Sequence, residues 1–131
     1  MRITLESAVL LSKRYLAIAQ EQLKTASGER AEQLKLMVNT LNKVPANPCN
    51  SMYEAIQCYM LLWEIMCLEQ APNPFAFSVG NADRVFEPYR ANDGLSREEA
   101  ASLLKHFVVS CGIGNSGYIL VYFIIGINIF Y

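Results

Sequence analysis

Residues 44–89 of the chain read VPANPCNSMYEAIQCYMLLWEIMCLEQAPNPFAFSVGNADRVFEPY. Pro45 and Pro48 prevent a preceding helix from continuing, because each lacks a backbone N–H and disfavours helical geometry in the residue before it. Ser51 and Glu54 then have the spacing of a capping box, in which each side chain accepts a hydrogen bond from the other residue's backbone N–H. A new helix is therefore predicted to begin near Ser51.

This predicted helix is apolar on nearly every side. Its apolar residues after Ala55 are Ile56, Tyr59, Met60, Leu61, Leu62, Trp63, Ile65, Met66 and Leu68. A helix with this pattern is expected to be buried on all sides. A membrane span is the alternative, but Glu54, Glu64 and Glu69 would be costly in lipid and favour the core of a soluble domain.

Length and charge narrow the class of protein. The 131 residues are enough for one domain with a substantial core. The 11 basic and 12 acidic residues nearly cancel, so the chain offers no strong field to nucleic acid or acidic lipid. Glu6 interrupts the first apolar run, which is unlike a signal peptide. We expect a cytoplasmic protein that binds no nucleic acid and no membrane.

The cysteines do not have the spacing of a metal site. The four cysteines form no C-x-x-C pair, and His106 is the single histidine, so we expect no bound metal. Cys58 and Cys67 are nine residues apart and are predicted to lie on opposite faces of one helix. They are interpreted as small buried thiols in a reducing compartment.

Two amphipathic helices are predicted before the apolar one. Residues 4–24 and residues 29–42 each place apolar side chains on one side and charged side chains on the other. A Ser-Gly pair at residues 27–28 separates them. We therefore expect a helical hairpin whose charged faces are solvated.

After the apolar helix, the sequence indicates extended and turn segments. Residues 75–79 alternate in the manner of a strand. Gly80, Asn81 and Asp83 indicate a polar turn, and residues 86–89 are expected to lead the chain out of it.

A further helix is predicted after a second turn at Asp93 and Gly94. Ser96 and Glu99 form another capping box, and apolar residues follow at helical spacing. His106 lies off the apolar stripe and is expected to be a surface histidine without a catalytic role.

The C-terminal residues 111–131 have a different composition. No charged residue occurs after His106, and residues 118–131 are rich in Ile, Tyr, Phe and Val. This tail fits a strand, a short membrane anchor, or an end that is truncated or read out of frame. The residues alone do not distinguish these three interpretations.

The order of the motifs resembles a segment of the glycyl radical enzymes, the pyruvate formate-lyase family that includes the glycerol and choline-type lyases. That family reads V-P-x-x-P-A, E-A-x-Q, an aromatic helix, S-x-G-R-x-D, P-Y, a further Asp and E-E-A. The matching residues here are Val44-Pro45, Pro48, Glu54-Ala55-Ile56-Gln57, Trp63, Ser78-Val79-Gly80-Asn81-Ala82-Asp83, Pro88-Tyr89, Asp93 and Glu98-Glu99-Ala100. The likeness covers roughly residues 10–110.

The resemblance implies a fold and a chemistry. Residues 1–110 would be a partial pyruvate formate-lyase-like domain, mainly α in this chain and a fragment of a ten-stranded α/β barrel. The parent enzyme would be a formate acetyltransferase, lyase or dehydratase of anaerobic metabolism, acting on a C–C, C–O or C–N bond of a small metabolite. Its partner is an activating enzyme that uses S-adenosylmethionine and an iron–sulfur cluster to install a glycyl radical, and no cofactor is bound directly.

The resemblance also assigns candidate site residues. Ser78 is expected at the substrate cavity, where it hydrogen-bonds a substrate hydroxyl, although a hydroxyl that caps its own turn is an equal alternative. Asn81 replaces the family's arginine and lacks its bidentate guanidinium. Asp83 is expected to stabilise the turn. No catalytic residue is expected, because the chain has neither the radical motif R-V-x-G-[YF] nor the cysteine loop G-C-x-[EP].

The leading interpretation is therefore a truncated or frame-disrupted part of a glycyl radical enzyme that is inactive alone; whether the chain is itself an enzyme stays open. It predicts binding of a hydrophobic dye to Ile56, Trp63 and Met66, which would lack their barrel neighbours. The alternatives are a small helical protein-interaction module and a tail-anchored membrane protein that uses residues 118–131.

Overall fold

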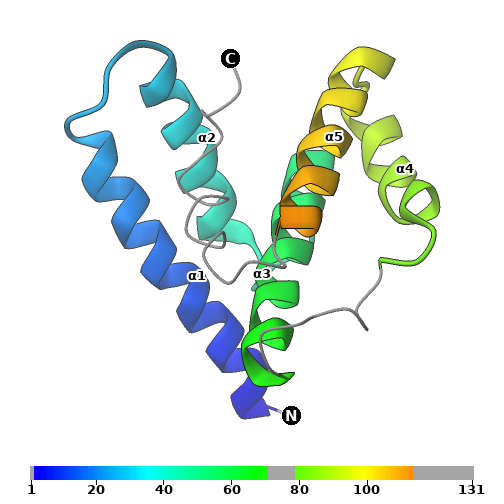
Figure 1. Cartoon of the computed structure of the whole chain (residues 1–131). Coiled ribbons are helices and arrows are strands. Elements are labelled where there is room, and N and C mark those ends of the chain that lie inside the picture. Colours follow the sequence, from blue (N-terminus) through cyan, green and yellow to red (C-terminus); the bar gives the residue numbers. More distant parts are fainter. Residues whose placement is uncertain (1, 71–78, 114–131) are drawn as a thin grey trace. The chain divides into compact units, whose positions relative to one another are not determined.

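The computed structural model describes residues 2–70 and 79–113, and these residues form five helices. They are α1 (Arg2–Leu23), α2 (Gly28–Lys43), α3 (Met52–Gln70), α4 (Ala82–Asp93) and α5 (Arg97–Ile113) (Figure 1). The described residues contain no strand, which agrees with the predicted mainly α chain. The predicted strand at residues 75–79 lies almost entirely outside the described residues, which resume at Val79.

The described residues belong to two compact units, of which the first covers residues up to Pro48 and the second starts at Cys49. The first unit is the predicted hairpin of α1 and α2. Small side chains on α1 are buried, among them Ala8 and Ala19, and they allow α2 to approach closely. Leu34, Met37 and Leu41 form the buried face of α2, as their helical spacing predicts.

Ser12 holds the C-terminal end of α2 against α1. Its buried hydroxyl lies 3.0 Å from the carbonyl oxygen of Leu41 and 2.8 Å from that of Val44. The last carbonyls of a helix have no partner within the helix, so a donor from a neighbouring helix satisfies them. Ser12 therefore adds to the local hydrogen bonds at this helix end, where the N–H groups of Val44 and Asn47 donate to the carbonyls of Thr40 and Lys43.

Replacing Ser12 with alanine should destabilise the first unit by about 1 to 1.5 kcal/mol, because buried carbonyls would lose their donor. Hydrogen exchange of the α1 and α2 amides measures this loss. Ser7→Ala is the matched control, since the exposed Ser7 hydroxyl donates only to Ile3 in its own helix. Equal exchange in the two variants would contradict the role of Ser12.

The second unit is built on α3, which begins where the capping box predicts. The N–H of Glu54 donates to the Ser51 hydroxyl at 3.1 Å, and the Glu54 carboxylate accepts from the N–H groups of Asn50 and Ser51 at 2.7 and 3.4 Å. Helix α5 begins in the same way, with the N–H of Glu99 3.2 Å from the Ser96 hydroxyl. The hydrogen bonds from Ser96 hold the pKa of Glu99 below its usual value.

An aromatic cluster joins α3, α4 and α5. The Phe107 ring of α5 packs edge-on against Tyr59 of α3, with centroids 5.5 Å apart, and against Phe86 of α4, at 5.4 Å. Phe86 and Phe107 are buried. Edge-to-face pairs of this kind add to the free energy of simple burial, so this cluster is the centre of the second unit.

The sequence predicted that α3 is buried on every side, and the structure corrects this prediction. Ile56 and Trp63 are buried, but Leu62 and Leu68 are 39% and 70% exposed. Of the three residues predicted to bind a hydrophobic dye, Ile56 and Trp63 are buried and Met66 is half-buried, and dye binding stays a prediction. The most exposed large apolar side chains of the described residues instead include Ile3 and Leu5 of α1.

The structure also corrects the polar-turn segment. Only Gly80 and Asn81 form a bend, and α4 starts at Ala82, so Asp83 and residues 86–89 are helical. Pro88 lies inside α4, where it lacks an N–H for the helical ladder. Because Pro88 is exposed, the carbonyl that loses this bond can be hydrated. The predicted turn at Asp93 is confirmed: α4 ends there, and Gly94 adopts the left-handed conformation, with φ +64°.

Candidate functional site

The predicted site residues lie around the start of α4. Ser78 lies outside the described residues. Asn81 is the residue that precedes α4, and Asp83 is in the first turn of the helix; both are exposed. Gly80, with φ +68°, gives the chain the sharp change of direction that leads into the helix.

Local geometry leaves the Asn81 side chain open to a ligand. Its backbone carbonyl accepts from the N–H of Val85 at 3.1 Å, which closes the first turn, but its side chain makes no capping hydrogen bond. Asp83 places a carboxylate at the positive end of the α4 dipole, a position that favours a negative charge. The entry to α4 thus presents an amide and a carboxylate, which can hydrogen-bond a polar ligand. The substrate roles of Ser78 and Asn81 and the turn-stabilising role of Asp83 stay predictions.

The opposite end of α4 is fixed to the start of α3. The Asp93 carboxylate accepts from the N–H of Met52 at 2.6 Å, and the Asn92 amide donates to the carbonyl of Asn50 at 2.8 Å. Met52 is the first residue of α3, so Asp93 caps that helix from a distant part of the chain. We call these two hydrogen bonds the α3–α4 clamp.

A groove runs between α4 and α5 in the second unit. Its lining residues are Glu87, Arg90, Arg97, Ala100, Ala101 and Leu104. Arg90 binds the Glu87 carboxylate through two nitrogens, each at 2.7 Å, and donates to the carbonyl of Leu95 at 3.0 Å. These bonds lower the pKa of Glu87 and raise that of Arg90. Arg90 therefore fastens α4 to the following turn and has little capacity left for a ligand.

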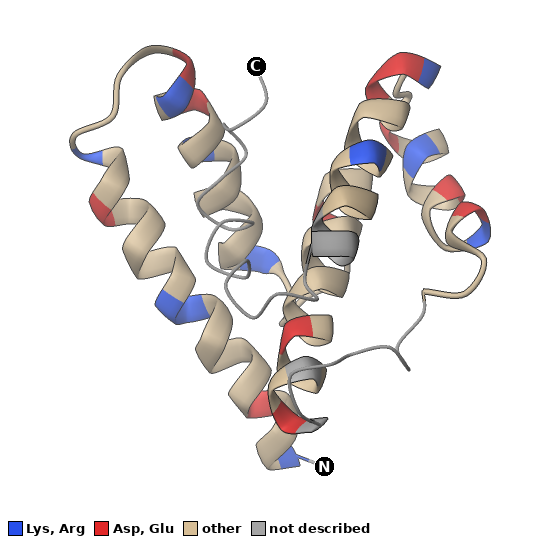
Figure 2. Ribbon diagram, viewed as in Figure 1, with Lys and Arg blue, Asp and Glu red and all other residues tan. Residues whose placement is uncertain are grey.

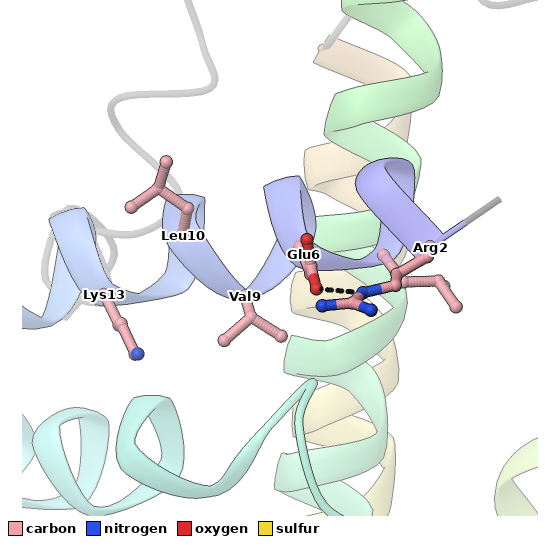
Figure 3. Close-up of a pocket in the computed structure, with 6 residues that line it drawn as sticks. Arg2, Glu6, Val9, Leu10 and Lys13 are labelled. Carbon is pink, nitrogen blue, oxygen red and sulfur yellow. Dashed lines mark hydrogen bonds and ion pairs between the residues drawn. The ribbon is translucent and has the colours of Figure 1, made fainter.

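A second hollow, on the first unit, does not have the character of a binding site. The described residues that line it belong to α1, namely Arg2, Leu5, Glu6, Val9, Leu10 and Lys13. Arg2 and Glu6 pair with each other at 2.8 Å (Figure 3). Among the described residues, this hollow lies along the side of one helix, and its paired charges Arg2 and Glu6 bind each other.

Polar and titratable groups also occur within the second unit. Burial raises the pKa of Tyr53 to about 12, and Gln57 is buried. His106 was expected at the surface, but it is half-buried, and desolvation lowers its pKa. Burial thus disfavours the protonated imidazole, and the half-buried position of His106 corrects the predicted surface position.

Charges of both signs occur along most helices (Figure 2). Helix α3 carries glutamates alone, and no described helix carries only Lys and Arg. Within residues 2–70 and 79–113, no three His, Cys, Asp or Glu side chains gather in a way that could hold a metal ion. None of the five described helices has both the length and the apolar content needed to cross a membrane.

These features define a mainly helical protein segment. In it, a bend at Gly80 precedes α4, whose first turn carries exposed polar residues. A family model described as pyruvate formate lyase-like matches residues 1–116. The chain belongs to this pyruvate formate lyase-like family, as the ordered motifs predict. No curated protein and no solved structure gives a significant match.

Proposed function

We propose that this chain is a portion of a glycyl radical enzyme that supplies helices and a substrate-side loop, and that it is inactive on its own. One observation carries the proposal. The family match covers residues 1–116, yet the 131 residues include neither R-V-x-G-[YF] nor G-C-x-[EP]. The described residues supply capped helices and an exposed polar helix start, which are positioning elements rather than radical chemistry.

The parent reaction is the conversion of a small metabolite in a radical lyase or acetyltransferase of anaerobic metabolism, in the cytoplasm. Ser78 donates to or accepts from a substrate hydroxyl, and Asn81 contributes a neutral amide where an arginine would place a positive charge. The exposed amide at the start of α4 supports this assignment. A neutral hydroxyl-bearing substrate suits this pair better than a carboxylate, which would lose its charged partner.

Radical installation tests the proposal directly. The full chain is incubated without oxygen with S-adenosylmethionine and a family activating enzyme in its reduced form, and organic radicals are measured by electron paramagnetic resonance. A complete family member is the positive control. We expect no radical on this chain and no turnover. A glycyl radical signal from the chain would overturn the proposal.

The loop assignment is tested in a complete family enzyme that carries residues 78–83 of this chain in place of its own. Ser78→Ala in that chimera should raise KM by about three- to tenfold and leave kcat nearly unchanged, as expected for the loss of one neutral hydrogen bond in binding. Val79→Ala, at the neighbouring position, is the matched control. An unchanged KM in Ser78→Ala would favour the turn-capping role of this serine.

A protein-interaction module is the second candidate, and one observation favours it. Ile3, Leu5 and Leu10 of α1 are 79%, 64% and 54% exposed, and exposed apolar side chains on one helix can contact a partner protein. This interpretation predicts a monodisperse species in sedimentation velocity. A chain that lacks the rest of its barrel is instead expected to bind hydrophobic dye and to associate nonspecifically.

A further inference from the structure

Two of the four cysteines meet at the start of α3. Cys49 is two residues before the Ser51 cap, and Cys58 lies in the second turn of the helix. Neither is in a disulfide, both are half-buried, and their side chains are hydrogen-bonded to each other. The sequence predicted only buried thiols and did not predict a contact between Cys49 and Cys58.

Hydrogen bonds fix both backbone groups of Asn50, the residue that follows Cys49. The N–H of Asn50 donates to the Glu54 carboxylate at 2.7 Å, and the carbonyl of Asn50 accepts from the Asn92 amide at 2.8 Å. The capping box fixes Ser51 in addition. The approach of the two thiols is thus imposed by the fold, because the segment that carries Cys49 is tied to α3 and α4.

We propose that Cys49 and Cys58 are a dithiol that closes to an intramolecular disulfide by exchange with a small-molecule disulfide such as oxidised glutathione. The Cys49 thiolate attacks the glutathione disulfide, forming a mixed disulfide and releasing one glutathione thiolate. The Cys58 sulfur then attacks the Cys49 sulfur and releases the second glutathione. One disulfide breaks and one forms, the two cysteines are oxidised, two glutathione thiols are produced, and the two cysteine protons pass to the solvent and the leaving thiolates. This inference does not depend on the proposed function.

The order of the two attacks follows from the raised pKa of Cys58. Burial, together with the charge and the hydrogen bond of the neighbouring Cys49, raises the pKa of Cys58 to about 12. A thiol with so high a pKa is seldom a thiolate near neutral pH, so we assign the first attack to Cys49 and the resolving step to Cys58. Below that pKa, the Cys58 thiolate fraction grows as the pH rises, so the closure step should accelerate by up to about tenfold per pH unit between pH 7 and 9.

The experiment treats the full native chain with oxidised glutathione, quenches with acid and alkylates the remaining thiols. Cleavage after glutamate cuts at Glu54 and Glu64 and so puts Cys49, Cys58 and Cys67 in three different peptides. We expect a linked Cys49–Cys58 peptide pair, and a fall from four free thiols to two. Circular dichroism checks that the helices persist in every variant.

Variants separate this reaction from nonspecific oxidation. With Cys67→Ser and Cys111→Ser as the background, the chain should still close the disulfide. Adding Cys58→Ser should trap glutathione on Cys49, because the resolving thiol is gone, and adding Cys49→Ser should leave Cys58 largely unmodified. Stable glutathione adducts on the background chain, a bond from Cys49 to Cys67 in the wild type, or closure that is equally fast in denaturant would each overturn the proposal.

Discussion

Replacing Phe107 with alanine should destabilise the second unit by about 3 to 5 kcal/mol, the cost of removing a large buried aromatic side chain from a packed core. Phe107 is 5% exposed and contacts both Tyr59 and Phe86 edge-on. Its loss leaves a cavity at the point where three helices meet, and α5 has few other contacts with α3. The measurement is urea unfolding followed by the fluorescence of Trp63, which is buried in α3 of the same unit.

Two further variants test whether the aromatic contacts and the burial of Phe107 account for this loss of stability. Phe107→Leu keeps much of the apolar volume but loses both edge-to-face contacts, so it should cost roughly 1 to 2 kcal/mol. Val108→Ala, next along α5, removes a side chain that is 64% exposed and should change stability by less than about 0.5 kcal/mol. Similar losses for Phe107→Ala and Val108→Ala would show that the cluster is not the core.

Replacing Asp93 with alanine should cost about 2 kcal/mol, because it removes a charge-assisted acceptor from the first N–H of α3. The 2.6 Å bond from Met52 joins the start of α3 to the end of α4, and α4 also contains Pro88, which weakens its own ladder. We therefore expect hydrogen exchange of the α4 amides to increase more than that of the α1 amides, which belong to the first unit.

Two further variants test the α3–α4 clamp. Asp93→Asn retains a neutral acceptor oxygen, so its cost should be about half that of the alanine variant. Asp83→Ala, at the exposed opposite end of the same helix, should lose only about 0.3 to 1 kcal/mol from the helix dipole. A larger loss from Asp83 than from Asp93 would show that the clamp contributes little to the docking of α4.

Local chemistry made much of the fold predictable. The capping boxes at Ser51 and Ser96 were predictable because both hydrogen-bonding residues lie three positions apart in the sequence. The α1–α2 hairpin was predictable because helical spacing of apolar residues requires no knowledge of the partner. The family was also predictable, because several weak motifs occur in order, and the match over residues 1–116 confirms it.

What the sequence did not disclose depends on contacts between distant residues. Gly80, Asn81 and Pro88 each favour a break in helical structure, so on sequence alone they carry more weight than the helical spacing within residues 82–93. In the structure this segment is helical, and contacts of Phe86 and Asp93 with other helices stabilise it. His106 was misplaced because its burial depends on what packs beside α5. The Asp93 cap and the Cys49–Cys58 contact likewise arise only after folding.

The Asp93 cap also has a consequence for synthesis on the ribosome. The N–H of Met52 must wait for a carboxylate 41 residues further along the chain, which takes about 2 to 8 s at ordinary translation rates. During that interval the start of α3 relies on Glu54 and Ser51 alone. A nascent chain paused before Asp93 should therefore present α3 with its local cap formed and its distant cap missing.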